Sequence, residues 1–257
     1  MRPVGSLFLV VIVCLCCSAV AQDSASKDHS ELSRVQYPAL VQQAASPEGF
    51  VPAGWGIEKK IEVDLNGDGD PDFVLVLHQM NPSNIFKIPD GGGADQYDSN
   101  PRILMVLFAD KKSNGYKLIA QNHQLIPRLD SPTIDDPFDG IKIGKGNFSV
   151  DLIASDRVGS MIESDFSFRF RYQNGRMILI GYDKSTLHRG TGHYYSVSVN
   201  YLAKKAKIDN GSAVPMAAEP GKIKWVPLPA DTTMPCLEQL GDGFEFKSPI
   251  PTTDPGM

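Results

Sequence analysis

The residues at positions 64–72 have the composition and spacing of a cation-binding loop. Oxygen-bearing side chains stand at loop positions one, three, five, seven and nine, and the sixth position is Gly69. Calcium takes about six to eight oxygen ligands, so a short loop must coil until alternate side chains converge on one point. Glycine permits the sharp turn at position six because it has no Cβ. We therefore predict a Ca2+ site with the ligands Asp64, Asn66, Asp68, Asp70 and Asp72.

The alternative interpretation is a polar β-turn between two strands. Asn-Gly, Asp-Gly and proline are ordinary turn residues, so a turn accounts for any one of these pairs. It does not account for four carboxylates and an asparagine within one short loop. Without a counter-charge these carboxylates would repel one another at close range. A divalent cation removes that repulsion, which favours the metal site.

The residues on either side of the loop predict strands instead of the helices of a helix-loop-helix calcium site. Residues 57–63 alternate apolar and polar side chains, and residues 73–77 form a short apolar run. Position twelve, where such a site has a bidentate glutamate, is Leu75. The loop is therefore expected at the tip of a β-hairpin.

In this setting the loop resembles the D-x-N/D-G-D-G-x-x-D loops of FG-GAP, or integrin-α-like, repeats and of dockerin-type sites. The resemblance implies that Asp70 binds through its backbone carbonyl, and that the side-chain ligands are Asp64, Asn66, Asp68 and Asp72. A propeller built from such repeats would show the loop several times, whereas this chain has it once. The resemblance covers the loop and does not extend to the fold.

Residues 1–21 predict a secretory signal peptide, with an apolar run at 7–17 and small residues at 19–21 before the cleavage point. The apolar run is shorter than the roughly 20 residues of a membrane span, so we expect no transmembrane span in the mature chain. Cysteines 14, 16 and 17 leave open a lipid-anchored product of the envelope. A lipoprotein cysteine normally follows a small residue, which these do not, so a periplasmic or secreted protein is favoured.

The charge and cysteine content narrow the class of protein further. The 257 residues carry a formal net charge of −5, which argues against nucleic acid or an anionic membrane as the main partner. After signal cleavage only Cys236 remains, so an intrachain disulfide cannot form. A bound metal would be an alternative cross-link that stabilises the fold. We predict a flexible leader at 22–36 and a loose, Pro/Gly-rich C-terminal tail at 209–257, in which Cys236 is a free or intermolecular thiol.

Between these segments, residues 37–208 predict one antiparallel β domain. Residues 37–45 have apolar side chains at helical spacing and predict one short N-terminal helix. Asn174-Gly175 joins two apolar runs and is a strong hairpin signal. We expect the aromatic stripe before this turn to form one core face of a sheet; its members are Phe166, Phe168, Phe170 and Tyr172. The fold class is therefore all-β, or β-dominated α+β, with an antiparallel sheet of hairpins.

A wider resemblance emerges from segments spread over residues 54–208. Together they look like a family of uncharacterised exported bacterial proteins and lipoproteins, which implies export and a β fold but supplies no reaction. The segments are Gly54-Trp55, the loop at 64–72, Asn100-Pro101-Arg102, Ala120-Gln121-Asn122, Asp135-Asp136-Pro137-Phe138, residues 170–175, Ile180-Gly181-Tyr182-Asp183 and Leu187-His188-Arg189.

The sequence contains little that predicts catalysis. Its five histidines occur without a His-Glu-x-x-His helix, zinc-ligand spacing or a Gly-x-Ser-x-Gly elbow. The best catalytic candidate joins Asp183, Ser185 and His188, but proximity in sequence gives little reason to expect triad geometry. The alternative is a polar loop in which Asp183 pairs with Arg189. His78 follows the calcium loop, and we expect a strand-end histidine there because calcium prefers oxygen.

These observations favour a non-enzymatic exported protein with a structural calcium loop and a binding or scaffold role in the cell envelope. Its partner would be an unknown protein or envelope component, contacted through the loops at 81–100 and 130–140. The second of these is acidic; we expect a solvated loop there, with a second cation site as the alternative. The competing hypothesis is a secreted or periplasmic hydrolase that uses His188 and the acidic loops.

Overall fold

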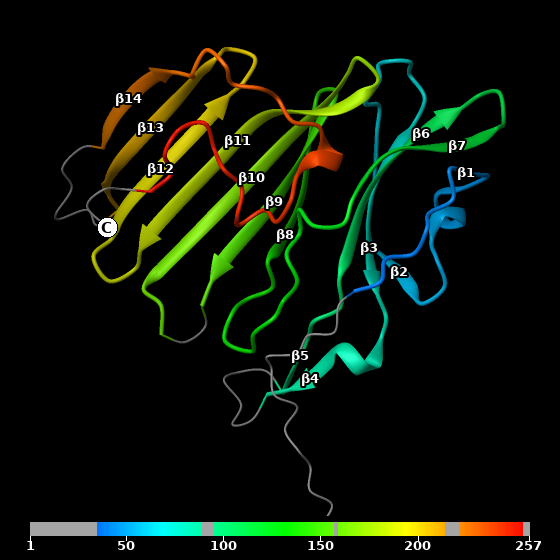
Figure 1. Ribbon diagram of the computed structural model, residues 1–257, viewed down its shortest axis with the longest axis horizontal. Coiled ribbons are helices and arrows are strands. Elements are labelled where there is room, and N and C mark those ends of the chain that lie inside the picture. The colour runs from blue at the N-terminus through cyan, green and yellow to red at the C-terminus, as the bar shows by residue number, and fades with distance from the viewer. Residues whose placement is uncertain (1–34, 89–94, 157–158, 214–220, 254–257) are drawn as a thin grey trace, which may run out of the picture. The chain divides into compact units, whose positions relative to one another are not determined.

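A computed structural model describes residues 35–88, 95–156, 159–213 and 221–253, and these residues form two main antiparallel sheets (Figure 1). The first sheet has five strands in the order β1-β7-β6-β3-β2. Its strands are β1 (Gln43–Ala44), β2 (Trp55–Val63), β3 (Asp72–Gln79), β6 (Arg102–Asp110) and β7 (Gly115–Asn122).

The second sheet has seven strands in the order β14-β13-β12-β11-β10-β9-β8, so each strand pairs with its neighbour in sequence. The Asn174-Gly175 turn joins its two longest strands, as the sequence predicts, with positive φ angles of 52° and 80°. Its strands are β8 (Phe138–Gly144), β9 (Asn147–Ser155), β10 (Ile162–Gln173), β11 (Arg176–His188), β12 (His193–Asn200), β13 (Lys205–Ser212) and β14 (Lys222–Pro227). The all-β, antiparallel prediction is confirmed.

Short elements complete the described structure. A two-stranded sheet pairs β4 (Ile85–Lys87) with β5 (Gln96–Asp98), within residues 81–100, which the sequence predicts as a loop. The helical elements of the described ranges are short 3-10 turns, namely η1 (Pro47–Phe50), η2 (Pro82–Asn84) and η3 (Leu237–Gln239).

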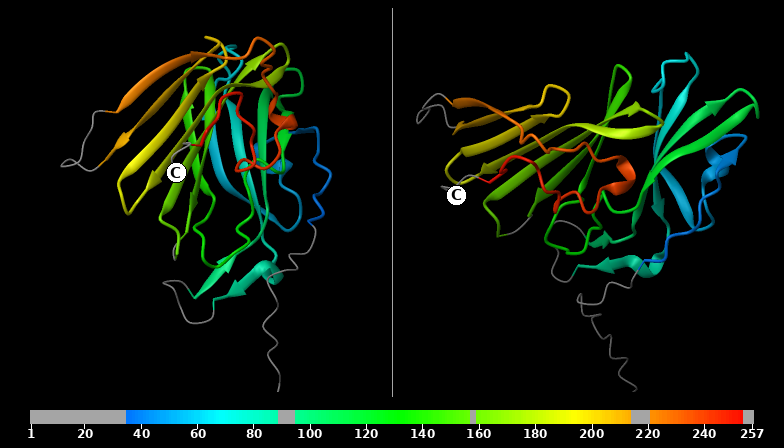
Figure 2. Two further views of the ribbon diagram at one scale, coloured as in Figure 1. Left: turned by 60° about the vertical axis from the view of Figure 1, so that its left-hand side comes forward. Right: turned by 45° about the horizontal axis from the view of Figure 1, so that its top comes forward.

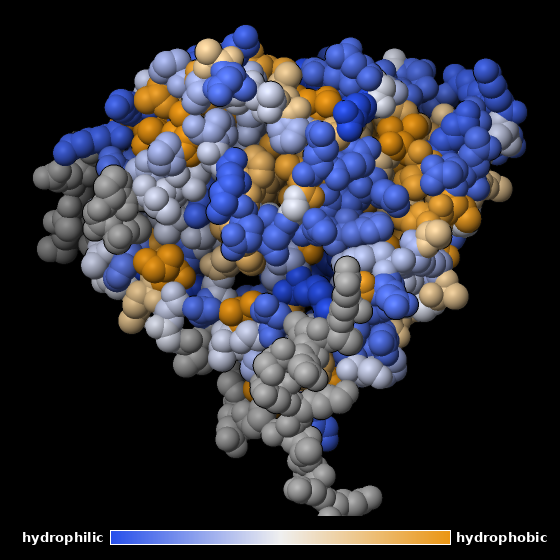
Figure 3. Space-filling view, in the orientation of Figure 1, coloured by the Kyte–Doolittle hydropathy of each residue, from blue (hydrophilic) through white to orange (hydrophobic). Residues whose placement is uncertain are grey.

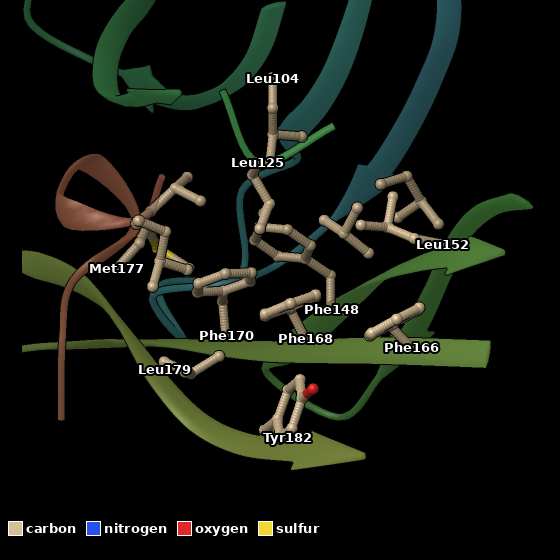
Figure 4. Close-up of a cluster of buried hydrophobic side chains, with 14 of the residues drawn as sticks. Leu104, Leu125, Phe148, Leu152, Phe166, Phe168, Phe170, Met177, Leu179 and Tyr182 are labelled. Carbon is tan, nitrogen blue, oxygen red and sulfur yellow. The ribbon is translucent and has the colours of Figure 1, made fainter. Parts of the chain in front are cut away.

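The main core joins the two sheets. The predicted aromatic stripe of β10 supplies it, because alternate residues of a strand share one face. Phe166, Phe168 and Phe170 are buried and Tyr172 packs against them. Figure 4 shows these phenylalanines rising from one strand, with Phe148 and Phe170 directed toward Leu125 and Leu104. The prediction that this stripe forms a core face is confirmed.

A second core covers the opposite face of the five-stranded sheet. Phe73, Leu75 and Leu77 of β3 face it, together with Ile103 and Met105 of β6. Since both faces of these central strands are covered, their sequences read as continuous apolar runs instead of alternating ones. On the molecular face drawn in Figure 3, hydrophilic residues predominate and apolar ones form small separate patches.

The predicted helix at 37–45 is wrong. The segment is extended, and Gln43 and Ala44 pair with Lys117 and Tyr116 of β7 as the edge strand β1. Tyr37, Leu40 and Ala44 pack against the second core instead of along one side of a helix. A helix of this length is marginal in water, so burial of these side chains and edge pairing decide the conformation.

The expectation of a loose C-terminal tail is also wrong for its described residues. The second sheet continues past residue 208 through the end of β13 and β14, and the following segment runs along that sheet in every view (Figures 1 and 2). Leu237 is fully buried, and Leu240 and Ile250 join the main core. The side-chain amide of Asn122 donates to the carbonyls of Leu237 and Leu240 at 2.7 and 2.8 Å.

The predicted signal peptide at 1–21 and nearly all of the leader at 22–36 lie outside the described residues. Within the described ranges, the helical turns are too short and too polar to cross a bilayer.

Candidate functional site

The oxygen-rich loop connects β2 to β3, at the tip of a hairpin as the sequence predicts. The two strands pair up to Val63 and Asp72, which leaves residues 64–71 to form the connection. Gly67 and Gly69 have φ angles of 82° and 83°, a region that favours glycine. Glycine at position six therefore has the conformational role expected from the sequence.

The first three predicted ligands coil the loop through hydrogen bonds to its own backbone. The two carboxylate oxygens of Asp64 accept from the N–H groups of Gly67 and Gly69 at 2.7 and 3.1 Å. Asn66 Oδ1 accepts from Asp68 N–H at 2.9 Å, and Asp68 Oδ1 accepts from Asp70 N–H at 2.8 Å. The hydrogen bond from the backbone of Asp70 lowers the pKa of Asp68 most, and the hydrogen bond from the side-chain amide of Asn66 lowers it further.

Asp72 differs from the other predicted ligands because it is completely buried. Its Oδ2 accepts from Leu65 N–H at 3.0 Å and its Oδ1 from Ala109 N–H at 3.1 Å. Burial raises the pKa of Asp72, and the charge of Asp68 raises it further. Asp72 thus ties the loop both to its own start and to the end of β6.

Asp70 carries the loop's ion pair with another hairpin. Lys111 Nζ, in the β6–β7 turn, lies 2.8 Å from Asp70 Oδ2. The hydrogen bond with Asp70 raises the pKa of Lys111. This contact uses the side chain of Asp70. It does not involve the backbone carbonyl, which is the ligand atom that the resemblance implies.

The donor set of the loop fits a hard cation, since every predicted ligand offers oxygen. In this conformation, however, the carboxylates of Asp64, Asp68 and Asp72 accept backbone N–H groups, and that of Asp70 pairs with Lys111. Among the described residues, groups of three or more His, Cys, Asp or Glu side chains arranged to hold a metal are absent. The loop therefore has the residue types and the turn of a calcium site, but its ligand side chains make hydrogen bonds and ion pairs within the protein.

The acidic loop at 130–140 contributes one strong contact. Arg102, whose side chain is 4% exposed, donates to both carboxylate oxygens of Asp136 and to both of Glu58, at 2.6 to 2.8 Å. Such bidentate pairs have fixed geometry as well as charge. Asp136 thus belongs to a bridge between the acidic loop and the bulge of β2 at Glu58.

The predicted catalytic candidates do not form a triad. Asp183, Ser185 and His188 all belong to β11, where alternate residues point to opposite faces, so His188 lies on the other face from Asp183 and Ser185. His188 Nδ1 accepts from Thr191 N–H at 3.2 Å. The alternative pairing of Asp183 with Arg189 is wrong as well, because Arg189 binds Glu163 at 2.6 Å.

The other two residues singled out by chemistry have structural surroundings. His78 is the last residue but one of β3, and its Nε2 lies 3.1 Å from the carbonyl of Asn100, as expected for a histidine near a strand end. Cys236 is a free thiol, as predicted, but it is buried, and Arg176 Nη2 lies 2.6 Å from its Sγ. Burial raises the pKa of this thiol.

Sequence reasoning missed a polar surface on the seven-stranded sheet, opposite its core face. Strand register places residues of six strands, β8 to β13, there in adjacent rows, one of which contains Ser149, Arg169, Gly181 and Asn200. The signal was present in β10, where Asp165, Ser167, Arg169 and Arg171 alternate with the aromatic stripe. Only the register shows that neighbouring strands add serines and further charges to the same face.

Comparisons of this chain with protein-family models, curated proteins and solved structures found no match.

Proposed function

We propose that this chain is an exported, non-enzymatic binding protein whose loop at 64–72 binds one Ca2+ ion as a structural staple. The ligands would be the side chains of Asp64, Asn66, Asp68 and Asp72, with the backbone carbonyl of Asp70. Calcium would supply the positive charge that holds these oxygens together. Its partner would be a protein or another component of the envelope, in the periplasm or outside the cell.

The observation that carries the calcium proposal is the placement of Asp72. A carboxylate is costly to bury unless its charge is compensated, yet Asp72 is buried, and the negative charge of Asp68 raises its pKa further. Its described hydrogen-bond partners are neutral backbone N–H groups. A cation between the loop oxygens would offset this cost, and would fasten the β2–β3 hairpin to the end of β6.

The binding role is favoured over the hydrolase alternative by the geometry of β11. Asp183 and Ser185 line a groove on the polar face, whereas His188 belongs to the opposite face. A nucleophile and its base must lie within hydrogen-bonding reach, which this arrangement does not provide. The polar face offers instead a surface for a ligand.

Calcium binding is tested by isothermal titration of the purified protein after removal of metals. We expect one Ca2+ per chain, and no measurable heat of binding for Asp68→Ala. Asp231→Asn, which changes an exposed acidic residue elsewhere, is the matched control and should bind as the wild type does. A wild-type protein that takes up no calcium would contradict the proposal.

A further inference from the structure

The polar face of the seven-stranded sheet is hollowed into a continuous groove. One section has a volume of about 590 Å³ and includes Arg169, Arg171 and Ser198. An adjoining section of about 360 Å³ includes Asp165 and Ser185. Both sections share Ser167 at the middle of β10, so they form one groove that follows this strand.

The strand register orders the charges along this groove. One cross-strand row carries only basic charges, on Lys142, Arg169 and Lys205, and has serine, glycine and asparagine between them. Two rows further along the strands, the charges are acidic, on Asp165 and Asp209. Lys205 and Asp209 lie outside the lining of the groove; within it, Arg169 belongs to the basic section and Asp165 to the acidic section.

Several of these charges are neutralised within the protein, and others are not. Lys142 pairs with Asp151 at 2.6 Å, and Lys207 pairs with Asp209 at 3.0 Å. Arg169 forms a long ion pair with Asp183, at 3.9 Å, which is beyond hydrogen-bonding distance. Within the described residues, neither Arg171 nor Asp165 has an ion pair within 4.0 Å. Arg171 and Arg169, whose contact with Asp183 is long, can therefore still donate hydrogen bonds to an anion.

The acidic end of the groove lacks compensating positive charge. Although Asp165 is exposed, partial desolvation of its carboxyl group raises its pKa; the negative charges of Glu163 and Asp139 raise it further, and Lys142 only partly offsets them. A ligand cation placed at this end would compensate that charge. The floor between the two ends is small and polar; Ser167 already donates to Asp151 at 2.6 Å, and Ser198 is exposed.

The spacing of the two ends sets the length of the ligand. Arg169 and Asp165 are four residues apart on one face of β10, which corresponds to about 13 Å. An extended peptide advances about 3.3–3.6 Å per residue, so a chain of about four residues spans this distance. Its free carboxylate and free ammonium carry the charges that the two ends lack.

We propose that this groove binds short zwitterionic peptides, with the C-terminal carboxylate at Arg169 and Arg171 and the N-terminal ammonium at Asp165. Serine hydroxyls of the floor offer hydrogen bonds to the peptide groups between them. The inference rests on the proposed binding role and assigns its surface and ligand class. It is independent of the calcium loop, so a failure here leaves the calcium result standing, and the reverse holds as well.

The test is titration of the full protein with tetra-alanine in three forms: free at both ends, N-acetylated, and C-amidated. We expect the free peptide to bind, and each cap to weaken binding about tenfold, as for loss of a charged hydrogen bond. Asp165→Asn should bind the free and acetylated peptides equally. Arg169→Gln should bind the free and amidated peptides equally.

Lys112→Gln removes an exposed positive charge from the β6–β7 turn and is the control that should leave all three affinities unchanged. Equal binding of capped and free peptides by the wild type would overturn the proposal. So would the absence of binding at about 10 mM free peptide, or stronger binding of a uronic acid oligosaccharide, which has carboxylates without an ammonium. Both substituted groove residues are exposed, so the variants should keep the wild-type unfolding midpoint.

Discussion

The carboxylate of Asp72 accepts a hydrogen bond from the backbone N–H of Ala109 at 3.1 Å. The last residue of the candidate calcium loop is thereby joined to β6, a central strand of the first sheet. Asp72 has a role in the fold even without a metal, whereas Asp68 is exposed and bonds only within the loop. The two residues can therefore be used to separate folding from metal binding.

Asp72→Ala should lower the free energy of unfolding by about 2–4 kcal/mol in a chelator, because a buried and a part-buried N–H group lose their acceptor. Asp68→Ala should cost less than about 1 kcal/mol under the same conditions. Urea unfolding in excess chelator measures both values. Equal effects of the two substitutions would show that Asp72 has no special part in the fold.

Arg102→Met should destabilise the protein by about 3 kcal/mol, because it leaves Glu58 and Asp136 without their buried partner. Lys60→Met is the control, since Lys60 and Glu48 form an ion pair whose side chains are 38% and 57% exposed. Such a surface pair is worth less than about 1 kcal/mol. Chemical unfolding of both variants at neutral pH makes the comparison; a loss at Arg102 no larger than at Lys60 would contradict it.

His123 should make the fold sensitive to mild acid. Its ring stacks on Tyr37 with centroids 4.5 Å apart, and burial lowers its pKa below the usual 6.5. The unfolded chain then binds the proton more tightly, so stability is complete above about pH 6.5 and falls as the pH drops toward the lowered pKa. His123→Phe keeps a ring for stacking and should reduce this slope.

The measurement is the unfolding free energy at several values between about pH 5 and 8, for wild type and His123→Phe side by side. The difference between the two curves isolates His123 from the other histidines. A constant difference across this range would show that the residue does not titrate differently in the fold.

Leu237→Ala should cost about 2–5 kcal/mol, as expected for truncation of a fully buried leucine. This tests whether the C-terminal segment is part of the core. Met234→Ala, at a side chain that is 41% exposed, should change stability by less than about 1 kcal/mol. If the two thermal midpoints matched, the segment would not contribute to the core as described.

The strands of this fold could be predicted where a local period exists. The alternation of Phe166, Phe168 and Phe170 marks a core face within a single strand, and the Asn174-Gly175 turn sets its hairpin. Leu237 and Leu240 follow no such period, and their burial depends on contacts with Asn122 far away in the sequence.

The same holds for the candidate sites: features set by neighbouring residues could be predicted, and features set by contacts distant in sequence could not. The spacing of Asp64 to Asp72 is local, so the hairpin loop could be predicted from sequence. The burial of Asp72 depends on Ala109, and the groove depends on the register of separate strands. The prediction of a helix at 37–45 is wrong because pairing with β7, a contact distant in sequence, outweighs the weak local preference for a helix.

The most direct measurement is thermal unfolding of the mature protein in calcium and in chelator, for wild type and Asp68→Ala. A ligand at about 100 times its dissociation constant stabilises the fold by about 2.7 kcal/mol, which raises the midpoint by several degrees. We expect calcium to raise the midpoint of the wild type and to leave that of Asp68→Ala unchanged. Identical wild-type midpoints in calcium and in chelator would contradict the proposed calcium staple.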